Sequence, residues 1–246
     1  MDFMFVDAKY KEADLKLNKE TIKHCKKYKV IAVYASVQFV HRLTTVLKQL
    51  EDAGIKVISS KPDRTDVKFQ ILGCDSQYKS LKLPEEPNAF LYVGDGVFHP
   101  RALVLAQKDN EKFKEVIRYD PMADQLILMG LDDCAKILKK YKAGMMKYLN
   151  AKNVGVLVTT KPGQQQFKMS RKLPAAYPEK NFYYFAENSF DFSHLEGFNF
   201  IELWINSACT RIGFDDAAHL TKPMINLMDA LEAEKVLSKE SLLTGI

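Results

Sequence analysis

The sequence predicts an α/β protein built from two similar parallel-sheet domains, and three observations support this. Short, continuous apolar runs rich in β-branched residues recur along the chain, as is typical of parallel strands buried on both faces. Segments with apolar residues at i, i+3 and i+4, typical of amphipathic helices, separate these runs. The 246 residues are enough for two domains of about 100–120 residues each.

The composition is that of an ordinary folded protein, with 47% apolar residues. The net charge of +5 comes from 36 Lys and Arg against 31 Asp and Glu, and these charges are not gathered into a patch. We therefore expect no direct binding of nucleic acid. No apolar run approaches the about 20 residues that cross a membrane, and the amino terminus lacks a secretory signal. The expected location is the cytoplasm, without membrane association.

These patterns predict the helices and strands of an amino-terminal connector and of a first domain. Residues 1–28 are expected to be a connector rather than a domain, with a strand at residues 3–6 and a short helix around residues 19–27. A first domain at residues 29–149 opens with a strand at 30–34, a helix from Phe39 to Leu50 that Gly54 ends, and a strand at 55–58. Such a βαβ unit has a right-handed crossover. Strands at 89–93 and 115–119, a short helix at 101–107 and a long amphipathic helix from Asp132 to about Asn150 complete it.

The second domain, at residues 150–246, repeats the same theme. A strand at 154–158 and a turn lead into a helix at 165–173, and strands follow at 182–185 and 200–205. Residues 223–225 are predicted to form an edge strand before a helical, polar tail. The similarity between the halves lies in the order of elements, because their sequence identity is slight.

The four cysteines are Cys25, Cys74, Cys134 and Cys209, and no two of them have CxxC spacing. Cys25 lies in the connector and Cys134 on the apolar face of the long helix, so neither is expected to have a chemical role. Cys74 follows an apolar segment at residues 69–73, and Cys209 follows the strand at 200–205. Ligands of open α/β sheets collect beyond the carboxyl ends of the strands. We therefore expect Cys74 and Cys209 to face one shared site.

Several chemistries are open to these two thiols. They could be redox partners, or one could be a nucleophile activated by a histidine base. Soft metals and iron–sulfur clusters would take both thiolates and need at least one more. From the residues alone, a metal or cluster site and two unrelated buried cysteines remain equally open. The candidate bases are His41, His99, His194 and His219.

Five motifs together carry a resemblance that none carries alone. In chain order they lie at residues 37–43 (VQFVHRL), 71–74 (ILGC), 91–100 (LYVGDGVFHP), 159–164 (TTKPGQ) and 206–212 (NSACTRI). Over about residues 29–226, the sequence resembles the diphthamide-biosynthesis family, the 2-(3-amino-3-carboxypropyl)histidine synthases.

The resemblance implies a specific chemistry. Members of this family fold as three similar α/β domains around a [4Fe–4S] cluster, with one cysteine ligand from each domain. By resemblance, Cys74 and Cys209 are the ligands of the middle and last domains. The family is of a non-standard radical S-adenosylmethionine type: a 3-amino-3-carboxypropyl group is transferred from S-adenosylmethionine to C2 of a histidine imidazole in translation elongation factor 2. Three thiolates leave one iron open to bind a ligand, as this transferase chemistry requires.

The resemblance also assigns residues near S-adenosylmethionine or the protein substrate. Each has an ordinary structural interpretation as well: a tight strand-to-helix turn, a helix start or a solvated histidine. The candidate cofactor-binding residues are Gln38, His41, Gly94, Asp95, Gly96, His99, Thr159, Thr160, Lys161, Gly163 and Gln164.

The sequence departs from the family in three ways. The first domain with its cysteine is missing, residues 209–211 read Cys-Thr-Arg where Cys-Pro-Arg is usual, and the helix after Gln164 is short. We therefore expect the carboxyl-terminal half of a split enzyme, with a separate chain supplying the third cysteine. Homo- or hetero-dimerisation and an electron donor are further implied partners. The alternatives are a non-catalytic scaffold subunit of the same complex and a degenerate α/β protein that binds a small molecule.

Overall fold

The computed structural model describes residues 8–11, 15–75, 77–161 and 163–246. The chain forms two compact units, and each is described by itself below. Unit 1 comprises residues 1–107 and 112–134, and unit 2 comprises residues 108–111 and 135–246. In the described part of the chain, no helix combines the length and the apolar character that membrane crossing requires.

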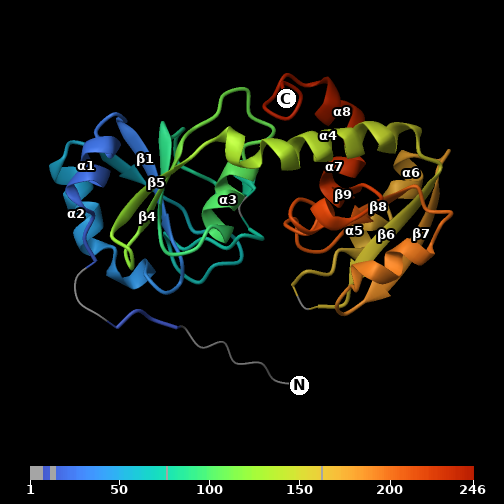
Figure 1. The fold of residues 1–246 in the computed structure, drawn as a ribbon, viewed down its shortest axis with the longest axis horizontal. Coiled ribbons are helices and arrows are strands. Elements are labelled where there is room, and N and C mark those ends of the chain that lie inside the picture. The colour runs from blue at the N-terminus through green and yellow to red at the C-terminus, as the bar shows by residue number, and fades with distance from the viewer. Residues whose placement is uncertain (1–7, 12–14, 76, 162) are drawn as a thin grey trace. The chain divides into compact units, whose positions relative to one another are not determined.

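Unit 1 contains a five-stranded sheet in the order β2-β1-β3-β4-β5, of which Figure 1 labels β1, β4 and β5. The first four strands of that order are parallel, and β5 pairs with β4 in the antiparallel direction. The strands are β1 (Val30–Ala35), β2 (Lys56–Ile58), β3 (Ala89–Val93), β4 (Val116–Asp120) and β5 (Gln125–Met129). Four of them were predicted from sequence and β5 was not. Most of its residues are exposed or half-exposed and do not alternate regularly with buried ones, so β5 lacks the alternation that predicts a strand.

Helices pack on the sheet of unit 1 as its apolar pattern requires. The odd-numbered residues of β1 and β3, among them Val33 and Leu91, face a core shared with Leu43, Val46 and Leu50 of the α2 segment. The helical elements are α1 (Lys19–Cys25), η1 (Val40–Arg42), α2 (Thr44–Asp52), η2 (Tyr78–Leu81), α3 (Phe98–Leu105) and η3 (Leu131–Cys134). The predicted helix 39–50 is thus a 3-10 turn followed by α2, and the positive φ of Gly54 (+78°) ends it as expected.

The connector prediction for residues 1–28 differs from the structure in part. The expected strand at residues 3–6 lies outside the described residues. Leu15, Leu17 and Cys25 are buried in the same core as β1, and α1 packs against α2. Residues 15–28 are therefore part of the first packed unit, because their apolar side chains complete its core.

Unit 2 contains a fully parallel four-stranded sheet in the order β7-β6-β8-β9 (Figure 1). Its strands are β6 (Asn153–Thr159), β7 (Asn181–Glu187), β8 (Leu203–Asn206) and β9 (Met224–Asn226). Its helical elements are α4 (Ala135–Asn150), α5 (Phe167–Ser170), α6 (Leu173–Ala176), η4 (Phe192–Gly197), η5 (Asp216–His219), α7 (Leu227–Leu231) and α8 (Ala233–Ser238). The predicted helix at 165–173 is instead the short pair α5 and α6, and α6 extends beyond residue 173.

The two sheets share one winding. Numbered within each unit, the parallel strands run 2-1-3-4 in both, and unit 1 adds β5 at its edge. The predicted α/β class with two similar parallel sheets is therefore confirmed. The boundary expected at residues 149/150 differs from the division at residues 134/135. Helix α4 belongs to unit 2 because its buried face, which includes Leu138 and Met145, packs on β8, β9, α7 and α8.

Candidate functional site

Cys74 lies beside the carboxyl end of β1, although no strand leads into it. The predicted strand-like segment makes only an isolated bridge between Gln70 and Ala35. Ala35 N–H donates to Phe69 O at 2.8 Å, and Ile71 N–H donates to Ala35 O at 3.1 Å. Phe69 has a φ of +71°, which turns the chain out of an extended conformation at once. The expectation of a strand ending at the cysteine is therefore wrong, and the segment that contacts the end of β1 lies just before the partly exposed Cys74.

The loop that carries Cys74 packs against the start of α3. A Cβ added to Gly73 would lie 2.5 Å from Cε1 of Phe98, so the backbone before Cys74 rests directly on that ring. The neighbouring His99 stacks on Tyr92 with ring centroids 6.1 Å apart. Unit 1 thus brings Cys74 together with the segment from Gly94 to His99, which sequence analysis assigned to cofactor binding.

The segment between β3 and α3 needs its glycines. A Cβ added to Gly94 would lie 2.7 Å from the Tyr92 hydroxyl oxygen. Gly96 has a φ of +66°, which favours glycine, and open space lies where its side chain would be. Asp95 between them is exposed. The backbone of Gly96 is therefore accessible to a ligand, whereas Gly94 is buried.

Gln38 and His41 have partners in the amino-terminal segment of unit 1. The backbone carbonyl of Gln38 accepts from Tyr10 N–H at 2.9 Å. His41 is exposed, and its Nε2 lies 3.1 Å from the Tyr10 carbonyl. Both residues follow β1 at the predicted sheet edge, and His41 binds backbone there.

Cys209 lies three residues beyond β8, in the loop that sequence analysis predicted. Asn206 ends β8 and binds this loop twice: its Nδ2 donates to Cys209 O at 2.8 Å, and its Oδ1 accepts from Ala208 N–H at 3.0 Å. Ser207 N–H and Oγ both donate to Leu157 O, which anchors the loop to β6. Cys209 itself is partly exposed.

Residues 159–164 leave the same edge of the unit 2 sheet as the Cys209 loop, because β6 and β8 are parallel neighbours. The buried Thr159 donates from Oγ1 to Asn188 O at 3.2 Å and accepts from Lys161 N–H. Gly163 has a φ of +74°. Thr160, Lys161 and Gly163 are exposed and Gln164 is half-buried, while Pro162 lies outside the described residues.

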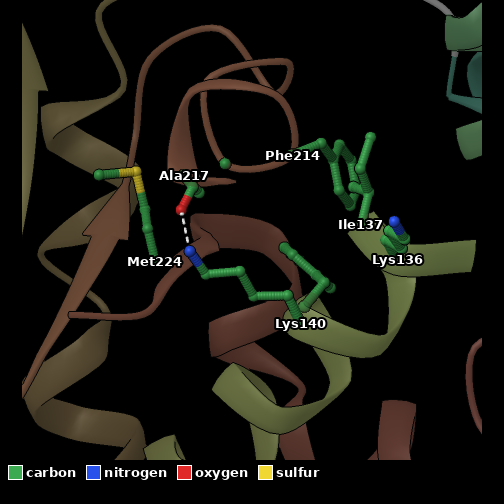
Figure 2. A pocket seen from close by; sticks show the side chains of 8 residues that line it. Lys136, Ile137, Lys140, Phe214, Ala217 and Met224 are labelled. Atoms are coloured by element: carbon green, nitrogen blue, oxygen red, sulfur yellow. Dashed lines mark hydrogen bonds between the residues drawn. The ribbon is translucent and has the colours of Figure 1, made fainter. Parts of the chain in front are cut away.

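A cavity of about 230 Å³ lies beside the loop that follows Cys209 (Figure 2). Its walls come from α4 and from the segment 213–224, and the figure labels Lys136, Ile137, Lys140, Phe214, Ala217 and Met224. Lys140 Nζ donates to Ala217 O at 2.7 Å and to Leu220 O at 3.1 Å. These contacts tie α4 to the segment at the far end of the cavity.

The other two cysteines are poorly suited to metal binding. Cys25 is fully buried, and burial, aided by the nearby Glu115 carboxylate, raises the pKa of its thiol to about 12. Cys134 is also buried, at 1% exposure, as predicted. A thiolate is the form that binds metals, and burial in apolar surroundings opposes it. The partly exposed Cys74 and Cys209 therefore fit a thiolate-bound cluster better than Cys25 and Cys134 do.

The described residues do not complete a metal site on their own. Among them, no group of three or more His, Cys, Asp or Glu side chains is placed to hold a metal ion. An iron–sulfur cluster with one open iron takes three thiolates. Cys74 and Cys209 match two of these ligands in donor type and exposure.

Sequence analysis missed the asparagines that hold the Cys209 loop. Asn206 was read as part of a motif, and Asn226 was not singled out. A signal existed, because each polar amide directly ends a buried apolar strand. Asp215 and Asp216 lie at the start of the 3-10 helix η5, and Asp215 also accepts a hydrogen bond from Arg211 Nε at 2.6 Å.

The fold and these sheet edges define a protein of two α/β units, each built on a mainly parallel sheet and each with a partly exposed cysteine beyond its strands. A family model described as putative diphthamide synthesis protein matches residues 1–242, and the chain belongs to this family. The resemblance drawn from the sequence is confirmed, and the match also includes residues 1–28.

Curated relatives and solved structures agree with this assignment. The 2-(3-amino-3-carboxypropyl)histidine synthase of Pyrococcus horikoshii is 28% identical, with 90% of this chain and 62% of that protein covered. Subunit 1 of the Schizosaccharomyces pombe synthase is 26% identical, with 95% and 53% covered. The crystal structure of Dph2 from Pyrococcus horikoshii with a 4Fe-4S cluster has a TM-score of 0.74 at 25% identity and covers 91% of this chain and 63% of that one. The chain thus spans less than two thirds of these proteins.

Proposed function

We propose that this chain is a subunit of a 2-(3-amino-3-carboxypropyl)histidine synthase, the enzyme of the first step of diphthamide biosynthesis. The observation that carries the proposal is the pair of partly exposed thiols, Cys74 and Cys209, in a chain of this family. Each lies at the carboxyl edge of a parallel sheet, where ligands of such folds bind. The reaction transfers the aminocarboxypropyl group of S-adenosylmethionine to C2 of a histidine imidazole in elongation factor 2.

Cys74 and Cys209 would be two thiolate ligands of one [4Fe–4S] cluster in this proposal. When bound, the cluster supplies the electron that cleaves the carbon–sulfur bond of S-adenosylmethionine. The third thiolate would come from a separate chain, since the described residues offer two suitable thiols and Cys25 and Cys134 are buried. The relative crystallised with a 4Fe-4S cluster supports this choice of cofactor.

Residues around the two thiols would bind and orient the substrates. The exposed backbone at Gly96 allows close approach of a ligand. The exposed carboxylate of Asp95 matches the ammonium group of S-adenosylmethionine, and the exposed ammonium of Lys161 matches its carboxylate. The loops after β3 and β6 would contribute His99 and the residues Thr159, Thr160, Gly163 and Gln164, respectively, to the substrate site. The outer part of that site would include Gln38 and His41.

The test is the iron and sulfide content of the full chain, purified without oxygen, alone and together with a candidate chain carrying the third cysteine. We expect about four irons per complex only in the combined preparation. Cys74→Ala and Cys209→Ala should each lower the iron content of the complex strongly. Cys25→Ala and Cys134→Ala are matched controls, because each removes one thiol from a buried position, and they should retain iron.

Two results would count against the catalytic assignment. A complex that stays free of iron in every preparation would favour a scaffold subunit. Unchanged iron in the Cys74→Ala, Cys209→Ala double variant would mean that the cluster, and with it the chemistry, belongs to the other chain.

A further inference from the structure

The carboxyl ends of β8 and β9 are joined by a pair of buried asparagines. Asn206 and Asn226 are register partners in the parallel sheet, and they are 2% and 5% exposed. Asn206 Nδ2 donates to Asn226 Oδ1 at 2.8 Å. Buried amides without partners would cost free energy, so a paired arrangement of this kind holds one geometry.

The two side chains hold the backbone on both sides of Cys209. Asn206 binds the Ala208 N–H and the Cys209 carbonyl, at 3.0 and 2.8 Å. Asn226 Nδ2 donates to the carbonyl of Thr210 at 3.0 Å. Three successive residues are thus fixed by side chains, which sets the direction of the Cα–Cβ bond of Cys209 while its thiol stays partly exposed.

Asn226 is held in turn by Tyr141 of α4. Asn226 N–H donates to the Tyr141 hydroxyl at 2.9 Å, and that hydroxyl donates to one carboxylate oxygen of Asp229. Lys108 Nζ donates to the other carboxylate oxygen at 2.9 Å. Burial, with the Asp229 charge, raises the pKa of Tyr141, so the hydroxyl keeps its proton and the direction of donation is fixed.

Packing leaves no room for the loop to move toward Asn226. A Cβ added to Gly213 would lie 2.3 Å from Asn226 Oδ1, so the backbone just past Cys209 passes directly over the amide. Phe214, the next residue, packs on Tyr141 with ring centroids 4.5 Å apart. The same two residues, Tyr141 and Asn226, therefore hold the loop through hydrogen bonds and through contact.

We infer that Tyr141 is a positioning residue for Cys209, acting through the hydrogen-bonded chain Tyr141–Asn226–Asn206. The inference deepens the proposed function and rests on it, since there Cys209 is a cluster ligand. A metal ligand held in place by surrounding hydrogen bonds binds without first ordering its loop. In this chain, hydrogen bonds within the protein already order the Cys209 loop.

The test compares Tyr141→Phe with Tyr148→Phe in the full chain by hydrogen–deuterium exchange. Both tyrosines are buried on α4, but the Tyr148 hydroxyl has no hydrogen-bond partner among the described residues, so its removal breaks no such chain. We expect Tyr141→Phe to speed amide exchange in residues 206–214 by about 10-fold, and Tyr148→Phe to leave it unchanged. In the iron-loaded complex, loss of iron to a chelator should also be about 10-fold faster for Tyr141→Phe alone.

Each outcome separates the two claims. Equal exchange in residues 206–214 for both variants would overturn the positioning role. Faster exchange in Tyr141→Phe together with unchanged iron in Cys209→Ala would support the effect of Tyr141 on the loop. It would also show that Cys209 is not a cluster ligand. A measurement on the unaltered chain covers the case of a variant that does not fold: fast exchange of the Ala208 and Asn226 amides would overturn the inference by itself.

Discussion

Gly155 of β6 lies directly opposite Trp204 of β8, and the indole ring of Trp204 covers the glycine. The two are register partners, and a Cβ added to Gly155 would lie 2.2 Å from Cζ3 of the indole. Trp204 is 1% exposed and packs edge-on against Phe185 and Phe198. Strand β8, which leads to Cys209, therefore packs against a position of β6 where only glycine fits.

Gly155→Ala should destabilise unit 2 strongly. The added methyl group has to displace either the indole or the strand, and overpacking of this kind costs about 1–3 kcal/mol or more. The midpoint of urea unfolding, followed by fluorescence of Trp204, the one tryptophan of the sequence, measures this. Gly197→Ala is the control, since nothing lies within 4 Å of its added Cβ. Equal midpoints for the two variants would contradict the packing described here.

Much of the fold follows from the sequence because the strands are buried on both faces. Continuous apolar runs at residues 30–34, 89–93 and 154–158 give an unambiguous signal, and β1, β3 and β6 lie there. Strand β5 gives none, because it is a half-exposed edge whose pairing depends on a turn at residues 121–124. Helix α4 was found, but its unit was not, because the sequence shows an apolar face without showing what it packs on.

The candidate site divides in the same way. Cys209 could be located from the strand before it, whereas the position of Cys74 depends on contacts that no local pattern encodes. These are the bridge at Ala35 and the seating of Gly73 on Phe98. Asn226 was missed because its role depends on register with Asn206, twenty residues earlier in the chain.

Reaction of the four thiols with a maleimide at pH 8 should fall into two classes. Cys74 and Cys209 are partly exposed, so they should react in the native protein. Cys25 and Cys134 are buried, and they should react only after unfolding in urea. Peptide mass spectrometry after a timed reaction identifies the sites. Fast labelling of Cys25 in the native state would contradict its place in the core.

Gly73→Ala should disturb the loop of Cys74 and leave the rest of unit 1 intact. The added Cβ would meet the Phe98 ring at 2.5 Å, so either the ring or the loop has to move. We expect a loss of about 1–3 kcal/mol in unfolding free energy and an altered rate of Cys74 labelling. Gly130→Ala is the control, because open space surrounds its added Cβ and its φ is not positive. Unchanged labelling in Gly73→Ala would argue against the contact with Phe98.

Cys25 should make the protein less stable as the solution becomes alkaline. Its pKa rises from 9.0 to about 12 on burial, so the folded state holds the proton more tightly than the unfolded state does. The stability from this difference is fully present below pH 9.0 and is lost as the pH rises toward 12, with a slope of up to about 1.4 kcal/mol per pH unit.

Buried tyrosines such as Tyr34, whose pKa is also raised to about 12, add to the alkaline loss in every variant. Cys25→Ala shares those tyrosines but lacks the thiol, so the difference in unfolding free energy between the unaltered chain and this variant isolates Cys25. That difference should shift in favour of Cys25→Ala between pH 9 and pH 11, and a constant difference over this range would show that the thiol ionises without leaving its core position.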